Sequence, residues 1–167
     1  EAAWLFGHSD GASIALLMAA RWPQRMQGLV VSAPHLFVED VTVQKIERAR
    51  LAYEQTDLRH KLGRYHDDVD SAFWGWNRIW LDPAFRAWNI EPEVAQIRVP
   101  VLAIQGCDDV YGTLAQIRGI AQRVPHTRLL ELPDCAHSPH RDQPDAVIAA
   151  AVAFIQAQHP RHSRRRG

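Results

Sequence analysis

The chain has 167 residues, of which 47% are hydrophobic and 23% are charged, a balance typical of a globular domain with a substantial core. Lysine plus arginine and aspartate plus glutamate each number 19, but four arginines lie within the last seven residues. The body of the chain is therefore mildly acidic, which argues against a nucleic-acid groove across it. No apolar run reaches membrane-spanning length. We expect a cytoplasmic protein with no membrane or nucleic-acid partner.

The predicted elements alternate along the chain between short apolar runs and helical segments. The predicted strands are residues 2–6, 28–33, 100–106 and 128–132. The predicted helices are residues 9–21, residues 114–124 and a last helix that begins at residues 143–144. Unbroken apolar strands separated by helices are typical of a sheet that is covered on both faces. The sequence therefore predicts an α/β fold, with a mostly parallel sheet and flanking helices.

One long insertion interrupts this alternation. Residues 34–95 are charged, aromatic and helical in character, and they contain four of the six tryptophans. We expect a helical insertion there, between core segments 1–33 and 96–158. The tryptophans Trp74 and Trp76 either line a pocket or form the insertion's own core, since large aromatic side chains do both.

Both ends of the chain carry signals of their own. The chain starts at Glu1 without a methionine and enters a predicted strand almost at once. We expect an upstream part that is absent here, so that this chain alone exposes an apolar strand edge, aggregates and is inactive. Residues 159–167 are arginine-rich and are expected to form a disordered basic tail, with a nucleic-acid or anionic-lipid arm as the alternative.

The two cysteines, Cys107 and Cys135, are too few for a disulfide framework, and we expect reduced thiols. Cys135 could ligate a metal together with His137 and His140. No second ligand cluster accompanies them, so we expect no metal site.

The motif Gly7-His8-Ser9-Asp10-Gly11 lies between the first predicted strand and the first predicted helix. A Gly-x-Ser-x-Gly run in that context is typical of a nucleophilic serine on a sharp turn, although an ordinary glycine-rich turn has the same composition. We expect both glycines to be required, because a side chain at either would collide with the neighbouring strand or helix.

Partners for this serine follow two later strands. Asp108 and Asp109 come after the third predicted strand, and His137 comes after the fourth. Since the carboxyl ends of parallel strands meet at one edge of a sheet, these side chains are expected to lie near Ser9. A histidine can take the proton of a serine hydroxyl, and a carboxylate can orient the imidazole. The pattern therefore predicts acyl chemistry at this edge.

With these residues the chain resembles the C-terminal part of the α/β-hydrolase superfamily, that is, a partial α/β-hydrolase fold with a helical cap. The resemblance covers nearly the whole chain and is carried by residues 7–11, 101–109 and 135–139. Gly106-Cys107-Asp108-Asp109 matches the acid loop of the family with Asp109 as the acid and Asp108 as the competitor. His137 matches the family's histidine, with His140 as the competitor.

The resemblance also implies the remaining parts of a site. The Asp10 N–H would be one oxyanion-hole donor, and the second would come from a loop that precedes this chain. A carboxylate beside an oxyanion is unhelpful, so we expect the Asp10 side chain to turn away and bond within the turn. The expected substrate contacts are His8, Trp74 and Trp76, and residues 34–95 would be the cap.

The resulting functional prediction is a serine hydrolase with Ser9 as nucleophile, His137 as base and Asp109 as acid. The bond cleaved would be an ester, thioester, lactone or carbon–carbon bond of a small, partly apolar acyl substrate, with no cofactor. Two alternatives remain open at this stage. One is a non-catalytic ligand-binding member of the same fold, and the other is an acyltransferase.

Overall fold

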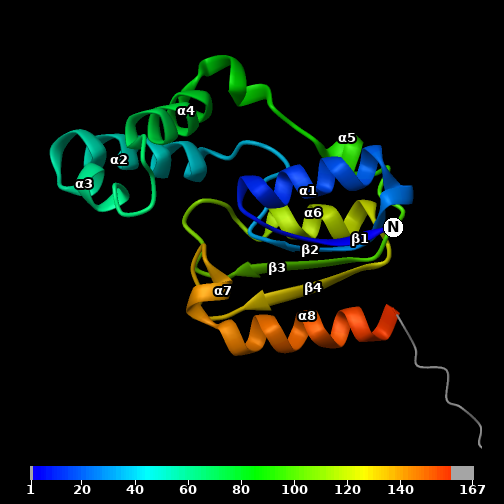
Figure 1. Ribbon diagram of the computed structural model, residues 1–167. Helices are drawn as coiled ribbons and strands as arrows, with labels where there is room; N and C mark the ends of the chain where they lie inside the picture. Colours follow the sequence, from blue (N-terminus) through cyan, green and yellow to red (C-terminus); the bar gives the residue numbers. More distant parts are fainter. Residues whose placement is uncertain (1, 159–167) are drawn as a thin grey trace, which may run out of the picture.

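The computed structural model describes residues 2–158 (Figure 1). The predicted basic tail, residues 159–167, lies outside the described residues. Within the described part of the chain, no helix is long and apolar enough to cross a membrane.

The centre of the molecule is a sheet of four parallel strands in the spatial order β1-β2-β3-β4. The strands are β1 (Ala3–His8), β2 (Met26–Ser32), β3 (Val101–Gly106) and β4 (Thr127–Leu132). Leu29 of β2 lies opposite Val101 of β3, and Ala103 of β3 lies opposite Leu129 of β4. All four carboxyl ends therefore reach the same edge of the sheet. The predicted α/β fold with a parallel sheet is confirmed.

Helices cover both faces of this sheet, as Figure 1 shows. One face carries α1 (Asp10–Arg21), α5 (Glu91–Val94) and α6 (Ala115–Arg123), and the 3-10 turn η1 (Pro23–Arg25) connects α1 to β2. The other face carries α8 (Pro144–Gln158), which the short helix α7 (Pro139–Asp142) precedes. Each crossover from one strand to the next parallel strand thus runs over a face of the sheet.

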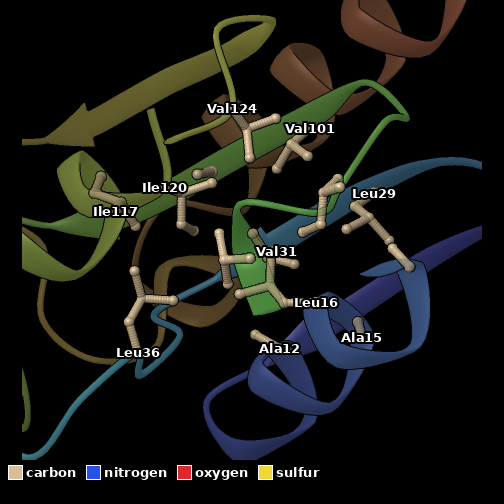
Figure 2. Packing of buried hydrophobic residues seen from close by; sticks show 14 of the residues in the cluster. Ala12, Ala15, Leu16, Leu29, Val31, Leu36, Val101, Ile117, Ile120 and Val124 are labelled. Carbon is tan, nitrogen blue, oxygen red and sulfur yellow. The ribbon is translucent and has the colours of Figure 1, made fainter. Parts of the chain in front are cut away.

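The two faces have separate apolar cores because successive strand residues point to opposite sides. Val31 of β2 faces the larger core, where it lies with Leu16 of α1 and Ile120 of α6 (Figure 2). Val30, its neighbour in β2, faces the core that α8 covers with Phe154. Burying a side chain of this size stabilises the fold by about 1.5–3 kcal/mol. The unbroken apolar strands of the sequence are explained by this two-sided burial.

The part of the chain that connects β2 to β3 forms a helical segment, which lies beside the sheet (Figure 1). It consists of α2 (Asp40–Gln55), α3 (Leu58–Leu62), α4 (Val69–Leu81) and the 3-10 turn η2 (Pro83–Ala87). Its small core contains Tyr53 of α2 stacked on Phe73 of α4, with ring centroids 3.8 Å apart. The Asn77 side chain of α4 donates a hydrogen bond of 3.1 Å to the Ile46 carbonyl of α2.

The ends of this segment meet where Phe37 and Asn89 form an antiparallel bridge. Leu36, Ile90 and Val94 lie outside that bridge and belong to the core between the sheet and α1. The segment therefore leaves and rejoins the rest of the fold at this bridge, which lies inside the predicted range 34–95.

The two glycines of the motif have different surroundings. A Cβ at Gly7 would lie 2.6 Å from the Gly11 carbonyl oxygen and 2.7 Å from the Ala12 Cα, which are backbone atoms that cannot rotate away. A Cβ at Gly11 would meet nothing within 4 Å among the described residues. The expectation of a collision is therefore wrong for Gly11, whereas at Gly7 the strand and helix touch.

These contacts predict opposite effects for one substitution at the two positions. Gly7→Ala should destabilise the protein by about 2–3 kcal/mol, because the backbone must shift to admit the methyl group. Gly11→Ala should be neutral or stabilising by up to about 1 kcal/mol, because alanine is favoured over glycine in a helix. Urea unfolding of both variants tests this, and equal losses of stability would contradict it.

Candidate active site

Ser9 occupies a strained turn between β1 and α1. Its backbone has φ 54° and ψ −126°, and a positive φ is uncommon for a residue other than glycine. The turn is fixed by a hydrogen bond of 2.9 Å from the Ser9 N–H to the Ser32 carbonyl, and by bonds from the Ala12 and Ser13 N–H groups to the Ser9 carbonyl. This backbone places the Ser9 hydroxyl at the carboxyl edge of the sheet.

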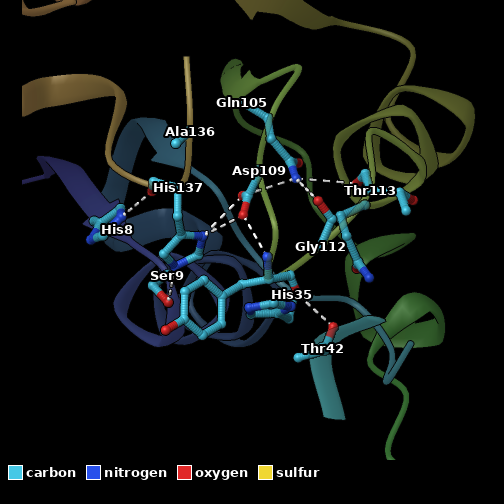
Figure 3. A network of polar contacts seen from close by, with 12 residues as sticks. His8, Ser9, His35, Thr42, Gln105, Asp109, Gly112, Thr113, Ala136 and His137 are labelled. Atoms are coloured by element: carbon cyan, nitrogen blue, oxygen red, sulfur yellow. Dashed lines mark hydrogen bonds and ion pairs between the residues drawn. The ribbon is translucent and has the colours of Figure 1, made fainter. Parts of the chain in front are cut away.

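Asp109 follows β3, and its side chain is only 1% exposed. Three donor groups satisfy the carboxylate (Figure 3). The Tyr111 N–H donates at 2.8 Å and the Gln105 side chain at 3.2 Å, while the His137 Nδ1–H lies 2.9 Å from Oδ2. Gln105 is held in turn by the Gly112 carbonyl at 2.9 Å. The carboxylate thus has one fixed orientation.

His137 follows β4 and connects Asp109 to Ser9. Because its Nδ1–H donates to Asp109, its Nε2 is left as an acceptor, and the Ser9 hydroxyl lies 3.0 Å from it. The His8 Nε2–H donates to the His137 carbonyl at 2.7 Å and so holds the backbone of the histidine loop. The three residues expected from the sequence form one continuous hydrogen-bonded series.

The histidine loop also touches the end of β3. A Cβ at Gly106 would lie 2.0 Å from the Cys135 carbonyl oxygen, so only glycine fits there. The Cys107 N–H donates to the Leu132 carbonyl at 2.8 Å, and the Asp108 N–H donates to the Cys135 carbonyl at 2.9 Å. These contacts fix the distance between the loops that carry Asp109 and His137.

The competing residues lie elsewhere. The Asp108 side chain is exposed and makes none of the bonds that bind Asp109 to His137. The His140 ring packs against the His8 ring, with centroids 4.7 Å apart. Cys135 is a buried free cysteine, and burial raises the pKa of its thiol to about 11. Among residues 2–158 no three histidine, cysteine, aspartate or glutamate side chains are arranged to hold a metal ion.

A cavity of about 370 Å³ opens above Ser9, between the sheet edge and the helical segment. The residues that line it are His8, Ser9, Asp10, His35, Ile46, Trp76, Trp80, Tyr111, His137 and Ser138. Of the expected substrate contacts, His8 and Trp76 line this cavity and Trp74 does not. The Trp74 ring instead lies against the Arg78 guanidinium, 5.2 Å from its centroid.

Sequence reasoning missed Trp80, Tyr111 and His35 as lining residues. Trp80 lies four residues after Trp76 in α4, so both side chains share one face of the helix, whereas Trp74 is only two residues away and lies on another. Helical spacing was therefore a usable signal for Trp80. The Tyr111 ring lies 4.7 Å from the His137 ring. No comparable pattern in the sequence indicated that Tyr111 would line the cavity.

The Asp10 side chain does not bond within its turn, so that expectation is wrong. The Trp80 Nε1–H donates to its Oδ2 at 3.4 Å, and Asp10 is one of the residues that line the cavity. The Asp10 N–H opens the first turn of α1, and no described residue is recorded as its acceptor. The first amides of a helix lack partners within the helix and favour negative charge, so this amide can receive an anionic oxygen.

His35 is a buried histidine in the wall of the cavity, and it is only 3% exposed. Its N–H donates to Ser13 Oγ at 3.0 Å, and the Ser13 hydroxyl donates to its carbonyl at 2.8 Å. Burial, together with a smaller effect of the nearby His137 charge, lowers the pKa of its imidazole to about 4. Within the described part of the chain, its Nδ1 has no hydrogen-bond partner.

A parallel sheet with a serine on a strained strand–helix turn, and with an aspartate and a histidine after later strands, defines the class of α/β hydrolases. The model of the alpha/beta hydrolase family matches residues 1–151. The chain belongs to this family. No curated protein matches the chain closely enough to be assigned as a relative.

Solved structures share the same fold. A putative non-heme bromoperoxidase from Mycobacterium tuberculosis has 22% identity and a TM-score of 0.70 over 93% of this chain and 67% of its own. A meta-cleavage product hydrolase from Pseudomonas fluorescens has 18% identity and a TM-score of 0.71 over 94% and 65%. An enol-lactonase from Burkholderia xenovorans has 23% identity and a TM-score of 0.62 over 90% and 64%. The chain thus spans about two thirds of these structures.

The buried His35 predicts a pH dependence of stability. An unfolded histidine titrates near pH 6.5, and the folded pKa is about 4, so the unfolded state binds more protons between these values. The contribution of neutral His35 to the free energy of unfolding is complete above about pH 6.5 and is lost as the pH falls towards 4. Between pH 7.5 and 4.5, the free energy of unfolding should fall by about 2–3 kcal/mol more in the wild type than in His35→Gln. Urea unfolding measures this, and parallel pH curves would refute it.

Proposed function

We propose that the full-length protein is a serine hydrolase that cleaves an ester, thioester, lactone or carbon–carbon bond of a small, partly apolar acyl substrate. The observation that carries this proposal is the continuous series from Ser9 Oγ to His137 Nε2, at 3.0 Å, and from His137 Nδ1 to Asp109, at 2.9 Å. Ser9 and His137 also line a cavity of about 370 Å³, a volume that suits a small substrate.

In the proposed reaction, Ser9 Oγ attacks the substrate carbonyl carbon while its proton moves to His137 Nε2. Asp109 stabilises the imidazolium that forms and keeps the Nδ1 proton directed at its carboxylate. When the tetrahedral intermediate collapses, His137 returns the proton to the leaving group. A water molecule activated by His137 then attacks the acyl-enzyme and releases the acid.

The negative oxygen of the tetrahedral intermediate needs a donor beside Ser9. The Asp10 N–H at the start of α1 supports this role, because it adjoins the nucleophile and no described residue is recorded as its acceptor. One such donor contributes about a hundred- to a thousandfold to turnover.

The helical segment from α2 to η2 would serve as the cap over this site. Trp76 and Trp80 of α4 and Ile46 of α2 face the cavity from that segment, and His8 borders it from the sheet. The mixture of large rings and an aliphatic side chain supports a partly apolar substrate.

Two variants test the assignment of the nucleophile and the acid. A fluorophosphonate probe should label the full-length protein, and Ser9→Ala should abolish the labelling. Asp109→Asn should lower kcat on an activated ester by about a thousandfold or more, because the imidazole loses its fixed tautomer.

Asp108→Asn is the matched control, since it removes the neighbouring, exposed carboxylate. It should leave labelling and kcat unchanged. Labelling that survives Ser9→Ala would overturn the assignment, as would equal losses of activity in Asp108→Asn and Asp109→Asn. Thermal unfolding of each variant separates these effects from misfolding.

A further inference from the structure

The described residues that line the cavity above Ser9 include one acid and no lysine or arginine. The acid, Asp10, contributes a carboxylate directly beside the nucleophile. The Lys45 ammonium lies over the Tyr111 ring, 5.8 Å from its centroid, but Lys45 does not line the cavity. A substrate that enters this cavity therefore meets negative charge.

The Asp10 carboxylate is only partly satisfied. The Trp80 Nε1–H donates to Oδ2 at 3.4 Å, a long hydrogen bond, and the structure records no donor to Oδ1 among the described residues. The same carboxylate adjoins the amide that would bind the oxyanion, where an uncompensated negative charge opposes the reaction. A positive group bound next to Asp10 would remove this penalty.

The other walls also suit a positive group. Trp76, Trp80 and Tyr111 contribute aromatic rings to the lining, and the face of an aromatic ring attracts cations. Trp80 directs its indole N–H at Asp10. His35 lines the same cavity and is only 3% exposed. Its lowered pKa keeps it uncharged at neutral pH, so it does not repel a cation.

We propose that this cavity binds the alkylammonium group of a cationic substrate, with the Asp10 carboxylate as its counter-ion and the rings of Trp76, Trp80 and Tyr111 as its walls. The inference rests on the proposed hydrolase function and adds the charge of the substrate to it. Bound substrate then cancels the charge that Asp10 places beside the oxyanion, so the carboxylate discriminates between substrates by their charge.

Two esters of the same shape test this in the full-length protein. Dimethylaminoethyl butyrate is protonated at neutral pH, and isopentyl butyrate has a carbon in place of the charged nitrogen. The wild type should prefer the cationic ester in kcat/KM by about tenfold or more. Asp10→Asn keeps the backbone N–H and should bring the ratio close to one. Asp108→Asn removes an exposed carboxylate and should leave the ratio as in the wild type.

A wild-type ratio of one or below would overturn the inference, and so would a preference that Asp10→Asn leaves unchanged. Because both esters are compared in one enzyme, general losses of activity cancel in the ratio. If neither ester is cleaved and the fluorophosphonate probe does not label Ser9, the proposed function fails. Calorimetric titration with dimethylbutylammonium then decides the cation site separately: binding that Asp10→Asn weakens supports the site, and absent or equal binding overturns it.

Discussion

The geometry of the candidate site depends on one buried carboxylate. A negative charge removed from water is tolerated only where hydrogen bonds replace its hydration. The Asp109 side chain, 1% exposed, obtains these bonds from the Tyr111 amide, the Gln105 side chain and His137. Because the Asp109 carboxylate needs hydrogen-bond donors, the loop after β3 is held around it. The hydrogen bond from His137 Nδ1 to Asp109 fixes the orientation of the imidazole. The close approach of Gly106 to the loop after β4 permits both.

The loop after β3 and the start of α6 also hold the helical segment. The Glu39 carboxylate, just before α2, accepts hydrogen bonds from the Thr113 N–H at 2.9 Å and from the Gln116 side chain at 2.7 Å. The Thr42 hydroxyl of α2 donates to the Tyr111 carbonyl (Figure 3). Tyr111 therefore has three contacts: its N–H donates to Asp109, its carbonyl accepts from Thr42 of α2, and the residue lines the cavity. The loop that carries Asp109, the helical segment and the cavity wall are therefore connected by hydrogen bonds.

The features that the sequence could predict are those set by local pattern. Continuous apolar strands indicated a two-sided parallel sheet, and a parallel sheet brings residues after its strands to one edge, which is how Ser9, Asp109 and His137 could be expected together. The positions of Trp74 and of the Asp10 side chain depend instead on how α4 packs over the sheet. Such packing joins residues 70 apart in the chain, as the Trp80–Asp10 bond does, and it leaves no local signature. The open space at Gly11 is likewise a property of the assembled surface.

The hydrogen bond from His8 to the His137 carbonyl matters for the acyl-enzyme stage of the proposed reaction. Once Ser9 is acylated, its oxygen has no proton to give to His137, and the direct hydrogen bond between nucleophile and base is lost. The His8 bond involves only a side chain next to the nucleophile and the backbone of the base, so it persists through that interval. In the proposed reaction, the backbone that carries His137 would therefore be held in the same place for acylation and for deacylation.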